Sequence, residues 1–275
     1  MPPLGGMAES VRRMKEKKVI DFHVHPFRES SYNLNLYPGT YEPDLEGMKK
    51  QLTEAGITHI CGSVLRRERD SQSLQEGFEG LRKLNREALR LQEMLGDFYT
   101  PGFHVHPAYV RESCDEIAFM HDQGVCLMGE LVHYMHGWGD FSEKNWAEIL
   151  DVAEQYGMVC SYHTPFDYDM RRMIDAHPGM TFVAAHPGDR QRVAEHMELL
   201  KACPNLCLDL SGTGLHRFGM LKRLVEQAGA DRLLFGTDYP ISNPRMYVQA
   251  VYGEEIGEKE REMIFHGNAE RILAL

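Results

Sequence analysis

The segment FHVHP contains two histidines one residue apart, His23 and His25, at the end of an apolar run that begins at Val19. Residues two apart in a β-strand point to the same side, so we expect both imidazoles to face one way. Imidazole nitrogens are common ligands of divalent metal ions, and this spacing therefore predicts part of a metal site. The same five letters recur at Phe103–Pro107, so the chemistry has two candidate positions.

Five further polar side chains stand near the ends of later apolar runs, although a buried parallel strand is usually apolar. They are Glu130, His163, His186, Asp209 and Asp238. Nitrogen and oxygen ligands without a thiolate favour zinc, manganese or iron, whereas magnesium prefers oxygen alone. We therefore expect a divalent metal, with zinc first and manganese or iron as alternatives. Asp209 fits a structural carboxylate equally well.

Such a site predicts hydrolysis. A divalent metal lowers the pKa of a bound water molecule to about 7. A neighbouring carboxylate can accept the proton and later return it to the leaving group. The predicted ligands are therefore suited to attack on the carbonyl carbon of an ester, an amide or a lactone.

Eight short apolar or β-branched runs would position these residues. They begin at Val19, Ile57, Asp97, Gly124, Gly157, Met180, Leu206 and Arg232. Strands that alternate with helices predict parallel pairing, and eight such units in this length predict an α/β protein with a closed (β/α)₈ barrel. The polar residues would then gather at the C-terminal face. An open doubly wound sheet is the alternative, but no glycine-rich nucleotide turn follows the first run.

The stretches between the runs have helical spacing. NWAEILDVAEQYG and MLKRLVEQAG carry apolar residues at i, i+3, i+4 and i+7, and they end at Gly157 and Gly229, which we expect to terminate the helices. Asp189 is the predicted N-cap of another helix.

Composition narrows the class of protein. The chain has 275 residues and a formal net charge of −11, which argues against nucleic acid or an anionic membrane surface as a partner. No apolar run approaches the roughly 18 residues that span a bilayer. Six scattered cysteines without a CxxC pair indicate reduced thiols. We expect an N-terminal arm (1–18) that is not a secretory signal, one barrel domain (19–275) and a cytoplasmic location.

Taken in order, these segments resemble the amidohydrolase superfamily. The HxH of the first strand, the histidines that end strands five and six, and the aspartate of FGTDYP carry the resemblance. The closing HGNAERIL, in which Asn268 is expected to cap the last helix, is similar to the amidohydrolase-related branch that contains aminocarboxymuconate semialdehyde decarboxylase. The resemblance runs from Ile20 to Leu273 and implies a distorted, TIM-like (β/α)₈ barrel.

The resemblance also implies a ligand set. The implied metal ligands are His23, His25, His163 and Asp238, and Asp238 would also shuttle the proton of the hydrolytic water. His186 would either bind a second metal or act on the substrate. Glu130, in LMGELVHY, is similar to the bridging glutamate of binuclear hydrolases, whereas mononuclear members have no ligand there. We interpret Glu130 as bridging two ions, with His163 and His186 on the second; a single ion is the alternative.

The second FHVHP copy matches no metal position of the superfamily. Because it ends the third predicted strand, we expect His104 and His106 to point into the mouth of the barrel. There they would bind substrate or orient metal ligands. The alternative is that both rings bind loop carbonyls.

Arginines follow several strands on the predicted catalytic face. They are Arg66, Arg67, Arg69, Arg190, Arg217 and Arg245. Because guanidinium groups bind carboxylate or phosphate in a bidentate manner, we expect a carboxylate-bearing small molecule, bound by Arg66 among others. His133 and Tyr134, in the loop after Glu130, are predicted to border it. Solvated arginines and a packed surface loop are the alternatives.

The leading hypothesis is therefore a metal-dependent hydrolase of a small anionic ester, lactone or amide. A non-oxidative decarboxylase with one metal is the second hypothesis, because the same branch contains such enzymes. A barrel that only binds a partner is the third, but an unused ligand set would leave costly unpaired polar groups. A homodimer is expected only as the commonest oligomer.

Overall fold

A computed structural model describes residues 17–29, 32–34, 43–66, 76–163 and 167–275. The predicted N-terminal arm therefore lies outside the described residues, except for Lys17 and Lys18. Within the described part, no helix combines the length and the apolar character needed to cross a membrane.

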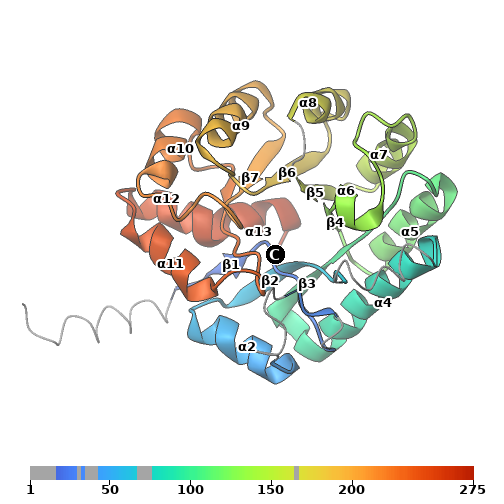
Figure 1. The fold of residues 1–275 in the computed structure, drawn as a ribbon, viewed down its shortest axis with the longest axis horizontal. Helices are drawn as coiled ribbons and strands as arrows, with labels where there is room; N and C mark the ends of the chain where they lie inside the picture. Colours follow the sequence, from blue (N-terminus) through green and yellow to red (C-terminus); the bar gives the residue numbers. More distant parts are fainter. Residues whose placement is uncertain (1–16, 30–31, 35–42, 67–75, 164–166) are drawn as a thin grey trace, which may run out of the picture.

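Eight parallel strands follow one another around the sheet in chain order (Figure 1). They are β1 (Ile20–Asp21), β2 (His59–Ser63), β3 (Tyr99–Phe103), β4 (Leu127–Leu131), β5 (Val159–His163), β6 (Thr181–Ala185), β7 (Leu206–Asp209) and β8 (Leu233–Leu234). Backbone hydrogen bonds between the segments that follow β1 and β8 close the ring. Phe22 N donates to Phe235 O, and His25 N donates to Tyr239 O, each at a distance of 2.8 Å. The (β/α)₈ prediction is confirmed, and the two strands at which the ring closes, β1 and β8, have only two residues each.

Most of the helices form an outer ring around the strands in Figure 1. They are α2 (Leu45–Glu54), α4 (Phe78–Leu95), α5 (Val110–Asp122), α6 (His133–His136), α7 (Trp146–Gln155), α8 (Asp167–Ala176), α9 (Arg190–Ala202), α10 (Met220–Ala228), α11 (Pro244–Gly253), α12 (Glu258–Glu262) and α13 (Asn268–Leu273). A 3₁₀ turn (Gly96–Phe98) precedes β3, and a π-helical turn (Met263–Gly267) precedes α13.

Three predicted helix ends are confirmed. The carboxylate of Asp189 accepts a hydrogen bond from Arg192 N and so caps α9. Gly157 and Gly229, which follow α7 and α10, have φ angles of 64° and 84°, a conformation that glycine adopts without a steric penalty.

The prediction that Asn268 caps the last helix is wrong. Asn268 is the first residue of α13, and its side-chain amide instead donates to Ala230 O at 2.7 Å and Leu233 O at 2.8 Å. Ala230 precedes β8 and Leu233 begins it, so Asn268 ties the last helix to the last strand. The position of Asn268 next to the last helix suggested that its side chain would cap that helix. A buried amide group, however, forms hydrogen bonds with whichever carbonyl groups lie nearest in the folded chain.

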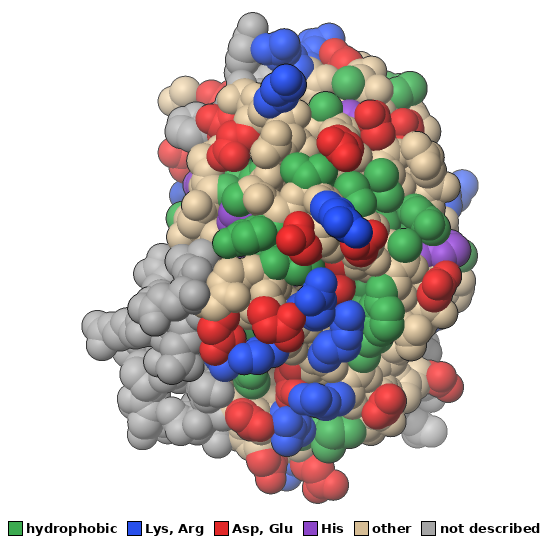
Figure 2. Space-filling model, turned by 90° about the vertical axis from the view of Figure 1, so that its right-hand side faces the viewer, with side chains coloured by type: hydrophobic (Ala, Val, Ile, Leu, Met, Phe, Trp, Pro, Cys, Tyr) green, Lys and Arg blue, Asp and Glu red, His purple; other side chains and the backbone are tan. Residues whose placement is uncertain are grey.

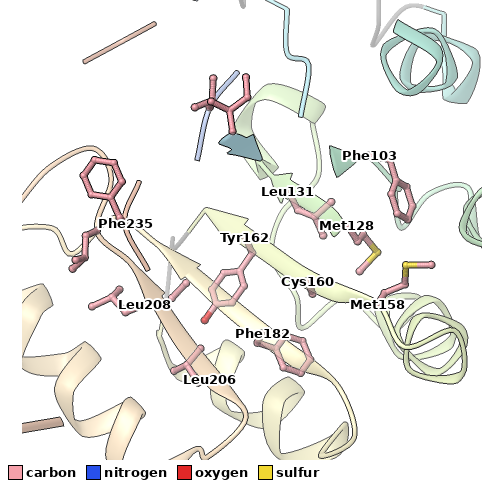
Figure 3. Close-up of a cluster of buried hydrophobic side chains, with 14 of the residues drawn as sticks. Phe103, Met128, Leu131, Met158, Cys160, Tyr162, Phe182, Leu206, Leu208 and Phe235 are labelled. Atoms are coloured by element: carbon pink, nitrogen blue, oxygen red, sulfur yellow. The ribbon is translucent and has the colours of Figure 1, made fainter. Parts of the chain in front are cut away.

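Two hydrophobic clusters hold the barrel together. The larger one packs strand residues against the helices; it includes Tyr162, Phe182, Leu206 and Leu208, which lie together along β5 to β7 in Figure 3. The smaller cluster takes side chains from seven of the eight strands, which can meet only inside the ring; they are Ile20, Cys61, Leu127, Val159, Val183, Cys207 and Leu234. Ala269 and Leu273 of α13 join it, so α13 covers the N-terminal end of the barrel. The C-terminal end of the barrel is therefore the end available for a functional site.

The outer surface carries charges of both signs. Figure 2 shows the face at the right of Figure 1, where basic and acidic side chains are interspersed. On α4, for example, Arg82 pairs with Glu79 at 2.9 Å and Arg90 pairs with Glu87 at 3.3 Å. An exposed pair such as Arg82–Glu79 contributes at most about 1 kcal/mol, whereas the carboxylate of Glu87 is buried.

Candidate metal centre

Six of the predicted residues meet at the C-terminal ends of the strands. They are His23 and His25 after β1, Glu130 in β4, His163 at the end of β5, His186 after β6 and Asp238 after β8. The cluster is largely buried, and the side chains of His163 and His186 are the most exposed, at 27% and 14%. Among these six side chains, exposure is therefore greatest on the side formed by β5 and β6.

Glu130 lies between two pairs of histidines. Its Oε2 atom is 3.3 Å from His23 Nε2 and 3.6 Å from His25 Nε2. Its Oε1 atom is 3.0 Å from His163 Nδ1 and 3.4 Å from His186 Nε2. The two oxygens of one carboxylate thus face different pairs.

Asp238 completes the first pair. Its Oδ1 atom is 3.7 Å from His23 Nε2 and 3.5 Å from His25 Nε2, and these two nitrogens are 3.1 Å apart. The imidazole of His25 is oriented by a contact of 3.0 Å between Nδ1 and Ser63 O. Because a carbonyl only accepts, Nδ1 carries the proton and Nε2 is directed at the carboxylates.

The donor atoms fit a divalent metal. Two groups have their ligand atoms within 4.8 Å of one another, namely His23, Glu130 and His186, and His23, His25 and Asp238. Imidazole nitrogen and carboxylate oxygen without thiolate are the donors that zinc, manganese and iron prefer. His23 belongs to both groups, so two metal ions bound there would lie next to each other beside His23.

The backbone is strained at two of these residues. His186 has a φ of 69° and Asp238 a φ of 62°, a conformation that costs a residue with a side chain about 1–3 kcal/mol. Asp238 is held in it by bonds of 2.8 Å from its N–H to His23 O and from Ile241 N–H to its carbonyl. The only other such residue in the described part of the chain is Ala274, so the strain is concentrated at the site.

The pKa values of the first pair of histidines are raised. Burial lowers the pKa of His23, but the charges of Glu130 and Asp209 outweigh burial and raise it well above its usual value. Burial likewise lowers the pKa of His25, and the carboxylates of Asp238 and Glu130 raise it to about 9. Protons on these rings therefore balance the carboxylates, and a divalent cation would compete for the same place.

The carboxylates shift in the opposite direction. Burial raises the pKa of Glu130, but the charge of His23 and hydrogen bonds from His163 and His186 bring it well below its usual value. Burial also raises the pKa of Asp238, and the contact with His25 together with the charge of His186 lowers it overall. Both side chains are therefore ionised at neutral pH, as metal ligands must be.

Asp209 contacts the centre through His23. The side chain is fully buried, and its Oδ2 accepts from His23 Nδ1 and, at 2.9 Å, from Ser211 Oγ. Its Oδ1 accepts from Ser211 N at 2.8 Å. Asp209 thus lies on the far side of the imidazole from Glu130.

Sequence reasoning missed Asp21, Thr237 and Ser211. Asp21 Oδ1 accepts from Thr237 N at 2.9 Å and from His23 N at 3.2 Å, and its Oδ2 accepts from Thr237 Oγ1 at 2.5 Å. Burial raises the pKa of Asp21 to about 7, despite these bonds. For Asp21 the sequence contained a signal, because Asp21 precedes His23 by two residues and should therefore lie on the same side of the strand.

The second FHVHP copy lies beside the cluster. His104 Nε2 donates to Val64 O at 2.8 Å. His106 Nε2 donates to His136 O at 2.9 Å, and its Nδ1 accepts from Ala108 N at 3.0 Å. These bonds match the alternative in which both rings bind loop carbonyls, and a contact with substrate stays a prediction.

His133 and Tyr134 begin α6 and border the open side of the cluster. The Tyr134 ring is 52% exposed and meets the His163 ring edge-on at a centroid distance of 5.2 Å. The His133 ring is 6.2 Å from His163, and Trp138 packs on it at 5.8 Å. Their role in binding substrate stays a prediction.

Arg66 is the arginine that follows β2 most closely. Its guanidinium lies over the Tyr32 ring at 5.4 Å, and its Nε has no hydrogen-bond partner among the residues that the structure describes. Arg67 and Arg69 lie outside those residues.

The other predicted arginines have different neighbours. Arg217 donates to Gly188 O at 2.9 Å, and Arg190 is exposed at the start of α9. Arg245 pairs with Glu54 at 2.9 Å, and both line a cavity of about 380 Å³ beside the segment that follows β8. Within the described part of the chain, the predicted arginines therefore have no single binding partner in common.

Comparisons with known proteins agree with the fold. The model of the amidohydrolase family matches residues 20–275, as the resemblance predicted. No curated protein matches the chain.

Solved structures with this fold cover nearly the whole chain. An uncharacterised TIM-barrel protein from Bordetella bronchiseptica is 22% identical, with a TM-score of 0.74 over 94% of this chain and 98% of its own. A probable 2-pyrone-4,6-dicarboxylic acid hydrolase from Acinetobacter baumannii, with citric acid bound, is 16% identical, with a TM-score of 0.64 over 94% and 99%. A 5-carboxyvanillate decarboxylase from Novosphingobium aromaticivorans, complexed with manganese and a nitrobenzoic acid, is 13% identical, with a TM-score of 0.68 over 95% and 97%.

Proposed function

The chain belongs to the amidohydrolase family, and on that premise we propose that it is a metal-dependent hydrolase of a small, carboxylate-bearing ester, lactone or amide. The position of Glu130 carries the proposal. Its two oxygens face His23 and His25 on one side and His163 and His186 on the other, at 3.0–3.6 Å. A carboxylate so placed can hold two ions next to each other, and paired ions serve to bind and activate water.

The metal ligands follow from these contacts. His23, His25 and Asp238 would hold the first ion, His163 and His186 the second, and Glu130 would bridge them. Zinc fits this donor set first, with manganese or iron as alternatives. Bound there, the ions would polarise the substrate carbonyl and make water more acidic.

Asp238 is the proposed proton acceptor. Its carboxylate is ionised, because nearby histidines hold its pKa below the usual value. It is also 7% exposed at the C-terminal face, so it can take a proton at the reacting end of the site and deliver it to the leaving group. His186, which is half-buried on the open side, would contact the substrate or the second ion.

Arg66 supports an anionic substrate. Its guanidinium is half-buried, follows β2 on the face that carries the histidines, and has an unpaired Nε within the described part of the chain. A carboxylate would pair with the charge of the guanidinium. Tyr134 and His133, beside His163, and the rings of His104 and His106 are the further proposed substrate contacts.

A decarboxylase is the second candidate, and the similar fold of a manganese-bound decarboxylase favours it. In that reaction one ion would orient a carboxylate for loss of carbon dioxide, and Glu130 would only position the histidines. The same residues would serve, so the number of ions and the product separate the two candidates.

Metal content tests the proposal. Protein purified without chelator or added metal is expected to hold about two equivalents of zinc, manganese or iron, and Glu130→Gln about one. The parent should then hydrolyse lactones, esters or amides that carry a carboxylate faster than matched neutral ones. A single ion with release of carbon dioxide from aromatic or unsaturated carboxylates would favour the decarboxylase. Protein that takes up no metal on titration would contradict both.

A further inference from the structure

Ser211 contacts three other side chains at the base of the centre. Its Oγ atom is 2.9 Å from Asp209 Oδ2, 3.1 Å from His23 Nδ1 and 3.1 Å from His186 Nδ1. Asp209 Oδ2 also accepts from His23 Nδ1. We call Asp209 and Ser211 the hub, because together they touch one histidine on each side of Glu130.

The hydrogen atoms in the hub can be assigned from donor and acceptor chemistry. A carboxylate only accepts, so the single hydrogen of the Ser211 hydroxyl points to Asp209. The oxygen then offers only lone pairs to the two imidazoles. His23 Nδ1 and His186 Nδ1 must therefore each carry a hydrogen, and both rings present Nε2 toward Glu130.

The backbone packs closely against the hub. A Cβ atom at Gly212 would lie 2.3 Å from His186 Nδ1, and one at Gly236 would lie 2.1 Å from Asp209 Oδ1. Gly212 has a φ of 63° and its carbonyl accepts a hydrogen bond from the Tyr247 hydroxyl. Two glycines thus admit the hydrogen-bonded groups, and the surrounding chain fixes where they stand.

We propose that Asp209 and Ser211 are positioning residues that fix the orientation and tautomer of His23 and His186 together, and so set the affinity of both metal positions at once. The inference rests on the proposed metal centre. Groups that hold the second nitrogen of a ligand histidine usually contribute about 10–100-fold to metal affinity. The distinctive feature is that a single hydroxyl serves ligands of two ions, so its loss should weaken both.

Zinc titration of metal-stripped protein, in competition with a chromophoric chelator, tests the proposal. Ser211→Ala is expected to weaken both zinc equivalents by about 10–100-fold. Asp209→Asn is expected to weaken them further, because an amide nitrogen facing His23 forces the hydrogen onto Nε2.

Ser113→Ala is the matched control. Ser113 is a fully buried serine whose hydroxyl donates to His106 O and accepts from His106 N in the second FHVHP copy. Its loss should lower thermal stability as Ser211→Ala does but leave zinc affinity within about 2-fold of the parent. Equal zinc affinity in Ser211→Ala and the parent, or weakening of one equivalent alone, would overturn the proposal.

Nuclear magnetic resonance of the metal-free protein separates this proposal from the proposed function. In protein labelled with ¹⁵N-histidine, the hub predicts protected Nδ1–H signals for His23 and His186. The His186 signal should be lost or shifted in Ser211→Ala and retained in Ser113→Ala. If the parent binds no zinc, the proposed function fails while these signals still test the hub; a His186 Nδ1–H signal that is absent, or unchanged by Ser211→Ala, overturns it.

Discussion

The two FHVHP segments have the same sequence and nearly the same burial, yet they have opposite surroundings. All four rings are at most 8% exposed. His23 and His25 face the carboxylates of Glu130 and Asp238. His104 and His106 instead donate to the backbone carbonyls of Val64 and His136.

The pKa values follow this difference. Burial lowers the pKa of every buried imidazole. Carboxylates reverse the effect at His25, where the pKa rises to about 9, whereas the carbonyl bonded to His104 does not, and its pKa falls to about 4. The carboxylates that other strands bring to His23 and His25 therefore distinguish the candidate metal position from the second copy.

The backbone is also held differently in the two copies. In the first copy, strand neighbours bind it, as in the 3.0 Å bond from Val24 N to Cys61 O. In the second copy, side chains do so: Asn85 bonds both His104 N and His104 O, and Ser113 bonds His106. The second copy is therefore part of the framework between β3 and its helices.

Loss of one imidazole from each copy should give the largest difference between the two FHVHP segments. His25→Ala is expected to lose bound metal and to lower kcat/KM on the order of 10⁴-fold, because ligands of one centre act as a unit. His106→Ala is expected to keep its metal. Elemental analysis and steady-state kinetics measure the two effects, and loss of metal in both variants would mean that the copies are equivalent.

The pH dependence of stability should differ in sign between the two FHVHP segments. Because the folded-state pKa of His104 is about 4 and the unfolded value is 6.5, the unfolded chain binds the proton first as the pH falls. This histidine's contribution to stability is present above pH 6.5 and is lost toward pH 4, by about 3 kcal/mol. His25 in metal-free protein has the opposite sign, with a contribution present below pH 6.5 and lost as the pH rises through about 9.

Urea unfolding of His104→Gln at pH 7 and pH 4 measures the His104 term. Glutamine keeps a donor for Val64 O but does not titrate, so the variant should lose about 3 kcal/mol less than the parent between these pH values. His121→Gln, at an exposed position, controls for loss of a histidine as such. The same loss in His104→Gln and the parent would contradict the assigned pKa.

The smallest expected effect concerns the framework of the second copy. Ser113→Ala removes the hydroxyl that bonds His106 N and O, and we expect the free energy of unfolding to fall by about 1–2 kcal/mol with no change in metal content. Chemical denaturation measures it against Lys201→Ala, at a partly exposed position, which should stay within about 0.5 kcal/mol. A loss of metal in Ser113→Ala would show that the second copy supports the centre.

Most of the fold could be predicted from local patterns. Apolar runs identify buried strands whatever their neighbours, so all eight strands were predicted. Asp189, Gly157 and Gly229 end helices through their own conformational chemistry, which needs no tertiary contact. Asn268 was assigned wrongly because its partners, Ala230 and Leu233, are distant in sequence.

The sequence predicted which residues form the candidate site, but it did not predict which of their atoms contact one another. Strand-end positions indicated His23, His25, Glu130, His163, His186 and Asp238, since parallel strands deliver their C-terminal ends to one face. Which oxygen of Glu130 faces which histidine depends on strand register and tilt. Ser211 gave no signal of its own, because a serine after a strand is ordinary until the fold sets it between two imidazoles.

The sequence by itself determined the barrel, the face that carries the polar residues and the donor types available to a metal, because periodicity and residue chemistry are local properties. Only the tertiary structure decided that one FHVHP lies among carboxylates and the other among carbonyls. The reason is physical: the charge state of a buried imidazole depends on the groups within a few ångströms of it, and closure of the barrel chooses those groups.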